Sequence, residues 1–291
     1  MLEAYLKRIY EVAQTGDARE ESYYSSLEEL LRAFAGSTNR KNVRITVLPK
    51  KTEAGNPDFR VWDGRQQIVG YIEAKEPMVE NLDYIENSKQ LDRYKHTFPN
   101  LILTNFFEFR LYRNGKLVDK VSLARPFIIH ELKTVPPVEN KDAFLNLLDR
   151  FFLFSLPKAY TAESLAVELA KRTSFLRDQV VSEELKIDEG SILGFYQAFR
   201  EYLITGLTKE NFADLYSQTV TFGLFAARTR SKNTFNRKLA YSYVPKTIGM
   251  LRDVFKFISL GELSDQMECI VDDISEVLAV ADVNEILKGV L

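Results

Sequence analysis

The sequence has few residues that bind metals through sulfur or imidazole. Its 291 residues include one cysteine, Cys269, and two histidines, His96 and His130. A single cysteine excludes a disulfide framework and a zinc cluster within one chain. Two histidines disfavour a transition-metal site built from several imidazoles, and no serine motif supports a Ser-His-Asp hydrolase. The sparse cysteine favours a reducing setting, and we expect the cytoplasm of a bacterium or archaeon.

Long apolar runs, a secretion signal and an excess of positive charge are also missing. No stretch approaches membrane-spanning length, and the amino terminus lacks the basic start, apolar run and cleavage site of a signal peptide. We therefore expect no membrane partner. The 39 lysines and arginines are balanced by 41 aspartates and glutamates, for a net charge of −2. Because cationic side chains supply most nonspecific affinity for DNA, this chain alone should bind DNA weakly.

The composition is ordinary for a globular protein and the length suits two domains. Hydrophobic residues make up 45% of the chain and aromatic residues 12%. Residues 1–157 mix predicted strands and helices, whereas residues 158–291 show helical periodicity without a convincing strand. We predict an α/β (α+β) domain followed by an all-α domain, with the boundary between Ser155 and Tyr160.

Two carboxylates and a lysine lie on adjacent predicted strands. Asp58 opens a strand over residues 59–62, an Asp63-Gly64 turn follows, and a second strand over residues 67–75 carries Glu73. An Asp-Gly turn between alternating residues is a strong hairpin signal, so the strands should pair antiparallel and return the chain toward Asp58. Alternation along the second strand predicts an apolar face made by Ile68, Gly70, Ile72 and Ala74. The other face, which carries the charged groups, is made by Val69, Tyr71, Glu73 and Lys75.

This set of residues suits metal-assisted hydrolysis of a phosphate ester. Mg²⁺ takes oxygen ligands from one or two carboxylates and keeps several waters, so Asp58 and Glu73 are predicted ligands, with the carbonyl of Ala74 as a further one. We expect Mn²⁺ to substitute. The ion would acidify a bound water, and Lys75 would orient that water. A Glu-x-Lys triplet also occurs by chance on solvated strand faces, but the hairpin and its apolar face favour the catalytic interpretation.

A helix downstream adds to this pattern. Gln90 and Tyr94 lie four residues apart on one predicted helical face, before an apolar strand at residues 101–104. Together these segments resemble the PD-(D/E)XK nuclease fold, a central mixed sheet flanked by helices, with the Gln-x-x-x-Tyr addition of RecB-like nucleases. The resemblance implies that Gln90 and Tyr94 support Lys75 or the scissile phosphate. Taken alone, the segment would be an ordinary amphipathic helix.

The resemblance extends to one class of restriction-modification enzymes. The matching runs are residues 18–23, Pro57-Asp58, Glu73-Ala74-Lys75, residues 89–91 and residues 101–105. They look like the amino-terminal cleavage domain of type IIG, IIL and ISP enzymes, in which nuclease, helical spacer, methyltransferase and target recognition domain share one chain. The resemblance implies a metal-binding carboxylate on a first helix that leads into Leu27, Leu30, Leu31 and Phe34. We assign it to Glu20, with Glu21 as the alternative.

The second half is similar to the helical spacer of those enzymes, over residues 212–219 and 222–228. We predict core positions at Leu215, Phe222, Phe225 and Ala226, and structural polar roles for Gln218 and Arg228. The sequence contains neither a glycine-rich S-adenosylmethionine turn nor an Asn-Pro-Pro-Tyr type motif, so no S-adenosylmethionine site is expected. The resemblance implies that the methyltransferase and target recognition domains belong to a missing part of the chain or to a separate subunit.

Basic residues gather in two segments of the sequence. The first set is Arg40, Lys41, Arg44, Lys50 and Lys51, and the second is Arg228, Arg230, Lys232, Arg237 and Lys238. If the first set lies beside the metal site, it would bind DNA backbone phosphates without reading bases. The alternative for each set is a solvated surface.

The expected function is the Mg²⁺-dependent DNA endonuclease portion of a restriction-modification enzyme, which would pair transiently to cut both strands. The alternatives are a noncatalytic nuclease-fold scaffold that docks a methyltransferase or translocase, and a nuclease that acts on branched DNA or RNA. Clustered carboxylates without a cation repel one another. The sequence therefore suggests that Asp58→Ala stabilises the metal-free protein.

Overall fold

The computed structural model describes residues 1–40, 42–47, 57–63, 68–79, 81–125, 133–156, 160–187, 190–231, 234–244 and 249–288. These residues form two compact units. The first ends at Ser155 and the second begins at Leu156. Within the described ranges, no helix combines the length and the apolar character needed to cross a lipid bilayer.

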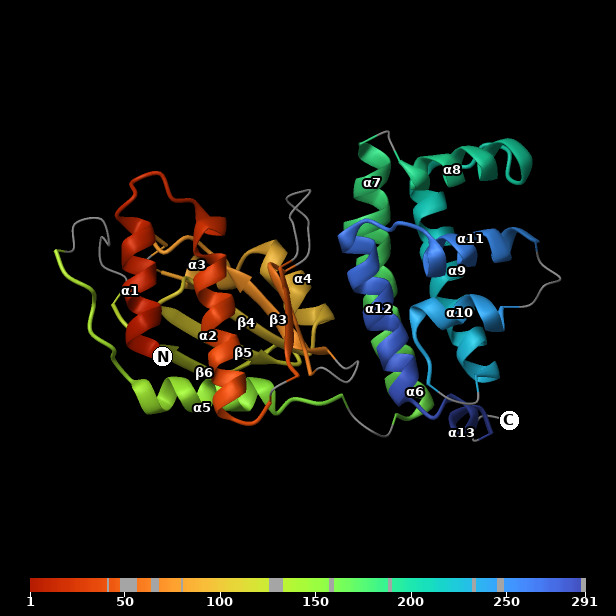
Figure 1. The fold of residues 1–291 in the computed structure, drawn as a ribbon. Helices are drawn as coiled ribbons and strands as arrows, with labels where there is room; N and C mark the ends of the chain where they lie inside the picture. Colours follow the sequence, from red (N-terminus) through yellow and green to blue (C-terminus); the bar gives the residue numbers. More distant parts are fainter. Residues whose placement is uncertain are drawn as a thin grey trace. The chain divides into compact units, whose positions relative to one another are not determined.

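A six-stranded mixed sheet forms the centre of the first unit (Figure 1). The strands lie in chain order: β1 (Arg44–Val47), β2 (Phe59–Trp62), β3 (Ile68–Ala74), β4 (Asn100–Thr104), β5 (Glu108–Arg113) and β6 (Lys116–Ser122). Neighbouring strands are antiparallel except β3 and β4, which are parallel. A parallel pair needs a crossover, and α3 (Asp83–Glu86) and α4 (Lys89–Thr97) lie in it. The predicted mixed sheet with flanking helices is confirmed.

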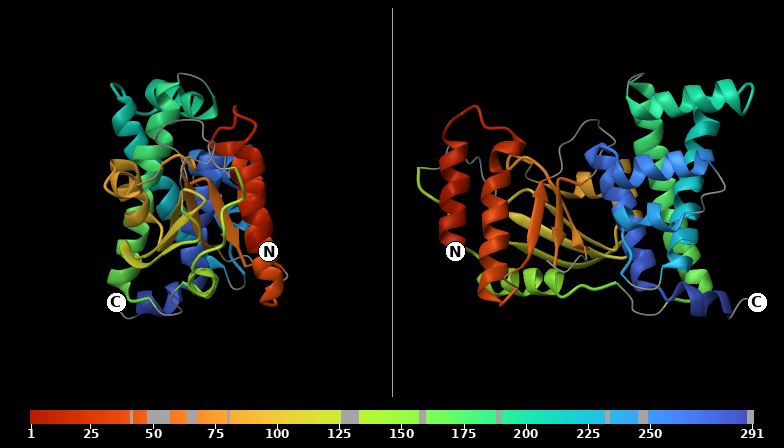
Figure 2. Two further views of the ribbon diagram at one scale, coloured as in Figure 1. Left: turned by 90° about the vertical axis from the view of Figure 1, so that its left-hand side faces the viewer. Right: turned by 45° about the vertical axis from the view of Figure 1, so that its right-hand side comes forward.

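Helices cover the sheet on both faces. On one face α1 (Leu2–Ala13), α2 (Tyr24–Ser37) and α5 (Lys141–Phe152) share a single apolar core with the sheet, and α1 and α2 lie side by side (Figures 1 and 2). The core takes Phe59 and Ile72 from the sheet, and the four apolar positions predicted for α2 are all buried in it. On the other face α4 reaches β3, where the rings of Tyr71 and Phe98 lie 4.1 Å apart.

The antiparallel pairing of β2 and β3 confirms the predicted hairpin strands. Phe59 pairs with Ile72 and Arg60 with Tyr71, so the next position along places Asp58 opposite Glu73. Gly64, in the predicted turn, lies outside the described residues. The two faces of β3 do not divide into buried and solvated, because every residue of the strand is buried. The polar face of β3 is therefore part of the interior.

The second unit is helical throughout its described residues. It contains a π-helical segment, η2 (Leu176–Val181); a 3₁₀ segment of the chain, η1 (Glu20–Tyr23), belongs to the first unit. The helices of the second unit are α6 (Ala162–Phe175), α7 (Ser182–Lys186), α8 (Ser191–Tyr202), α9 (Lys209–Arg230), α10 (Arg237–Tyr243), α11 (Gly249–Leu260), α12 (Asp265–Val280) and α13 (Val283–Lys288).

The buried face of α9 differs from the predicted one. Phe222 is 67% exposed and Ala226 is exposed, whereas Leu215 and Phe225 are half-buried. The buried stripe consists of Phe212, Ala213, Tyr216, Ser217, Val220, Thr221, Gly223, Leu224 and Ala227. The prediction was wrong because α9 carries apolar residues around most of its circumference. Periodicity then gives no unique inward face.

Gly70 lies where the sheet and α5 approach most closely. A methyl group at this position would lie 2.6 Å from the carbonyl oxygen of Asn100 and 2.6 Å from the ring of Phe151. We expect Gly70→Ala to lower the free energy of unfolding by about 3 kcal/mol, because a packed core accommodates added volume poorly. Urea denaturation measures this, with Gly36→Ala in α2 as the control. No heavy atom lies within 4 Å of the Gly36 position, and alanine there should be neutral or stabilising by up to about 1 kcal/mol.

Candidate active site

Two hydrogen bonds fix the carboxylate of Asp58, which lies just before β2. The side chain is fully buried. Its Oδ1 accepts a hydrogen bond from the Tyr24 hydroxyl at 2.6 Å, and its Oδ2 accepts one from the backbone N–H of Ala74 at 2.7 Å. These donors come from α2 and β3. Asp58 therefore connects helix α2 to the strand that carries Glu73.

Glu73 and Lys75 form a salt bridge on the same face of the chain. Glu73 is 1% exposed, and its Oε1 accepts a hydrogen bond from the Lys75 ammonium. The backbone N–H of Lys75 donates to the carbonyl of Thr104 at 2.8 Å, which continues the β3–β4 ladder one residue beyond the strand. The structure thus brings Asp58, Glu73 and Lys75 to one end of the β2–β3 pair.

Glu20 approaches the same end through Tyr24. The Tyr24 hydroxyl lies 2.9 Å from Glu20 Oε1 as well as 2.6 Å from Asp58 Oδ1. Burial, followed by the charges of Asp58 and Glu20, raises the pKa of Tyr24 well above its ordinary value. Glu21 is exposed, which favours Glu20 over it. The expected first-helix position needs a correction, because Glu20 lies in η1, after α1 and just before α2.

Sequence reasoning missed Tyr24 as part of this site. The available signal was its position four residues after Glu20, the spacing of neighbours on one helical face. Its contact with Asp58 spans 34 residues of chain, and no local pattern predicts such a contact.

Gln90 and Tyr94 share one face of α4, as predicted. The Gln90 side-chain amide donates to the Tyr94 hydroxyl at 3.1 Å, and Tyr94 is fully buried. Tyr94 packs against Phe98, which packs against Tyr71 of β3. Alternation along β3 puts Tyr71 on the same face as Glu73. α4 therefore packs on the sheet face that carries Glu73, and its contribution to chemistry stays a prediction.

The oxygen atoms at this end suit a hard cation. The carboxylates of Asp58, Glu73 and Glu20 and the carbonyl of Ala74 are the kind of ligands that Mg²⁺ prefers, and one or two carboxylates suffice for it. A carboxylate offers about four lone-pair positions, so the two donors on Asp58 orient it without exhausting its capacity. Among the described residues, no group of three or more His, Cys, Asp or Glu side chains is arranged to hold a metal. The role of Asp58 and Glu73 as a metal-binding pair stays a prediction.

The two described members of the first basic set, Arg40 and Arg44, lie away from these carboxylates. Arg40 lies beyond the far end of α2 from Tyr24, where it pairs with Asp149 at 2.8 Å. Arg44 is exposed on β1 and pairs in register with Trp62, four residues along β2 from Asp58. The expectation that this set contacts phosphates next to the site therefore has no support from Arg40 and Arg44. The other members, Lys41, Lys50 and Lys51, lie outside the described residues.

Arg60 is the basic residue of β2 that sequence reasoning overlooked. It pairs with Tyr71 across the ladder and therefore shares the sheet face of Glu73. Its guanidinium stacks on the ring of Trp62 at 4.6 Å, and the residue is 6% exposed. The period of two that links Asp58, Arg60 and Trp62 was the signal available in the sequence.

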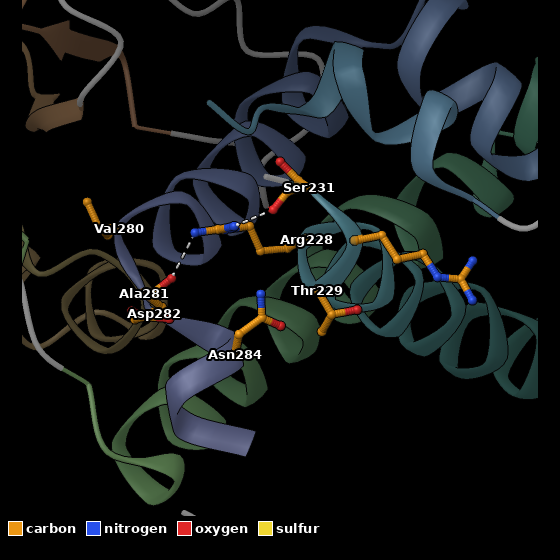
Figure 3. Close-up of a pocket in the computed structure, with 8 residues that line it drawn as sticks. Arg228, Thr229, Ser231, Val280, Ala281, Asp282 and Asn284 are labelled. Atoms are coloured by element: carbon orange, nitrogen blue, oxygen red, sulfur yellow. Dashed lines mark hydrogen bonds between the residues drawn. The ribbon is translucent and has the colours of Figure 1, made fainter. Parts of the chain in front are cut away.

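A hollow in the second unit lies among the ends of α9 and α12 and the start of α13 (Figure 3). It encloses about 780 Å³ and is lined by Arg228, Thr229, Arg230, Ser231, Val280, Ala281, Asp282 and Asn284. Arg228 donates to the carbonyls of Leu278, Ser231 and Ala281, at 2.9, 3.2 and 3.3 Å. Its predicted structural role is confirmed, because these bonds satisfy carbonyl groups at helix ends.

Another arginine of the second basic set also forms contacts inside the protein. Arg237 is 4% exposed and pairs with Asp272 at 2.9 Å and with Glu268 at 2.8 Å. Lys232 lies outside the described residues. Arg228 and Arg237 therefore hold the helices together and do not form a patch directed at solvent.

No protein-family model and no curated protein matches this chain. Among solved structures, one described as "cryoEM structure DrdV-DNA complex" is similar over 96% of this chain and 26% of that chain, with 20% sequence identity and a TM-score of 0.40. This chain spans about a quarter of that neighbour's length. A similarity this weak does not support a shared function.

The contacts of Asp58 reverse the stability effect expected from carboxylate repulsion. Asp58→Ala would leave the buried N–H of Ala74 and the Tyr24 hydroxyl without this acceptor. We expect a loss of about 1–3 kcal/mol in the free energy of unfolding, measured by urea denaturation in the presence of a chelator. Asp58→Asn is the matched control, since its amide can meet both groups, and should lose less. Stabilisation by Asp58→Ala would show that repulsion dominates instead.

Proposed function

We propose that this chain is a Mg²⁺-dependent deoxyribonuclease of the PD-(D/E)XK type, which hydrolyses DNA phosphodiester bonds. The observation that carries the proposal is the burial of Asp58 and Glu73 at opposed positions of the β2–β3 ladder, with Lys75 paired to Glu73. Burying charge is costly, and a pair of carboxylates in one place adds repulsion. Recruitment of a cation is a physical reason to keep such a pair.

Each residue has a distinct task in this proposal. When bound, Mg²⁺ supplies acidification of a water molecule and neutralises charge that develops on the phosphate. Asp58 and Glu73 hold the ion, and the Ala74 carbonyl adds an oxygen ligand. Lys75 orients the attacking water with its ammonium group. The water oxygen would form a bond to phosphorus as the ester bond from phosphorus to its leaving oxygen breaks. One water proton would pass to solvent, and the leaving oxygen would take up a proton from solvent.

Helix α4 supplies the support that the site requires. The hydrogen bond between Gln90 and Tyr94 holds both polar groups on the helical face that packs toward β3. We assign them to the support of Lys75 or of the scissile phosphate. Glu20 assists the cation directly or through a water molecule.

The two units suggest how this activity would be organised. In the proposal the first unit cuts DNA, and the helical second unit connects it to methyltransferase and target recognition domains in cis or on a separate subunit. Sequence choice would then come from those domains. Cleavage of both strands with one site per chain favours transient pairing of two copies.

The noncatalytic scaffold makes a different demand on these residues. A module that only docks a methyltransferase or translocase would gain little from burying the carboxylate of Glu73, because an apolar residue of similar volume is often as stable or more stable. The burial of Glu73 beside the half-buried Lys75 therefore favours the catalytic proposal. A branched DNA or RNA substrate would use the same phosphate chemistry and is distinguished by assay.

Lys75→Ala should reduce cleavage by at least about 10²-fold, because it removes the group that positions the water. The assay is nicking of supercoiled plasmid with Mg²⁺, run beside branched DNA and RNA of matched length. Lys116→Ala is the control, since Lys116 is exposed on β6. Circular dichroism should show both variants folded. Cleavage by Lys75→Ala at the wild-type rate would refute the assignment of Lys75.

A further inference from the structure

We infer that Tyr24 is a positioning residue, whose hydroxyl couples Glu20 to Asp58 and so completes the cation site. The inference rests on the proposed function, because it concerns the same cation. Tyr24 is an uncharged residue that contacts the carboxylates of Asp58 and Glu20 and is not itself a ligand of the cation.

The contacts of Tyr24 place its hydroxyl between two segments of the first unit. Its hydroxyl oxygen lies 2.6 Å from Asp58 Oδ1 and 2.9 Å from Glu20 Oε1. Glu20 belongs to η1 and Asp58 precedes β2. The hydroxyl therefore bridges η1 and the segment that leads into β2. It lies at the end of the β2–β3 pair where Glu73 and Lys75 also lie.

The ring of Tyr24 is held firmly enough to act as a positioning group. It is 7% exposed, and its centroid lies 4.8 Å from the ring of Phe59, the residue after Asp58. Tyr24 is also the first residue of α2, and Leu27 and Leu31 anchor that helix in the apolar core. The hydroxyl is thus fixed relative to the sheet, whereas Glu20 is half-buried in a short 3₁₀ turn.

The two contacts of the hydroxyl differ in kind because it carries a single proton. It can donate that proton to one carboxylate at a time, and the shorter contact is with Asp58. We assign the lasting hydrogen bond to Asp58. The longer contact, with Glu20, is the one that a bound cation or its water can replace. Loss of the hydroxyl would remove one of the two hydrogen bonds that orient Asp58 and would remove this contact of Glu20.

The test compares the wild-type 291-residue chain with Tyr24→Phe in Mg²⁺ titration calorimetry. We expect Tyr24→Phe to weaken Mg²⁺ binding by about tenfold or more, the usual effect of removing a group that orients a ligand. Tyr196→Phe in α8 is the matched control. Tyr196 is likewise 7% exposed, and its hydroxyl makes a buried hydrogen bond to the carbonyl of Leu207 at 3.1 Å. The control should lose thermal stability to a similar extent and keep wild-type affinity for Mg²⁺.

A double-mutant cycle separates positioning from simple structural support. Glu20→Gln should weaken Mg²⁺ binding in the wild-type chain but have little further effect in Tyr24→Phe, because the inference assigns the contribution of Glu20 to its contact with that hydroxyl. Additive effects of the two substitutions would overturn the coupling. A purely structural role would lower the melting temperature and leave this coupling at zero.

The remaining outcomes distinguish this inference from the proposed function. Unchanged Mg²⁺ affinity in Tyr24→Phe, alongside a loss of binding in Glu73→Ala, would overturn the role of Tyr24 alone. Absence of Mg²⁺ binding by the folded wild-type chain would overturn both. Weaker binding in Tyr24→Phe and wild-type binding in Tyr196→Phe would support both.

Discussion

The candidate site depends on the hydrogen bond from the Ala74 N–H to Asp58 Oδ2 and on the register that produces it. Antiparallel pairing of β2 and β3 places Asp58 opposite Glu73, and a one-residue slip would send every side chain of a strand to the opposite face. The parallel neighbour β4 then extends the ladder to the backbone of Lys75. Register therefore determines both the position and the orientation of the charged groups.

The site combines costly burial with satisfied contacts. Asp58 is held by donors from a helix and a strand, and Glu73 by the ammonium of Lys75. In a medium of low dielectric these interactions are stronger than in water, and loss of one partner leaves a buried charge less well compensated. These contacts leave the side chains of Asp58 and Glu73 little conformational freedom, which suits a site that must hold a cation and a water at defined positions.

Local patterns in the sequence were enough to predict the β2–β3 hairpin strands, the shared face of Gln90 and Tyr94, and the buried positions of α2. Each depends on a period of two or about 3.6 residues, or on turn chemistry. Contacts across long stretches of chain were not accessible in this way. The Tyr24–Asp58 bond and the pairing of Arg40 with Asp149, 109 residues away, both depend on packing of complete layers. The prediction of the inward face of α9 was wrong for a related reason, because the helices that pack against α9 decide which of its apolar sides is buried.

Mg²⁺ titration calorimetry of the folded wild-type chain and of Glu73→Gln tests the central claim most directly. It asks whether the buried carboxylates form a cation site without requiring the partners that cleavage of DNA would involve. Glu108→Gln is a suitable control, because Glu108 pairs with Arg110 on β5. The account predicts saturable binding by the wild type and the control, and its loss in Glu73→Gln. Absence of binding by a folded wild type, or equal binding in Glu73→Gln, would contradict it.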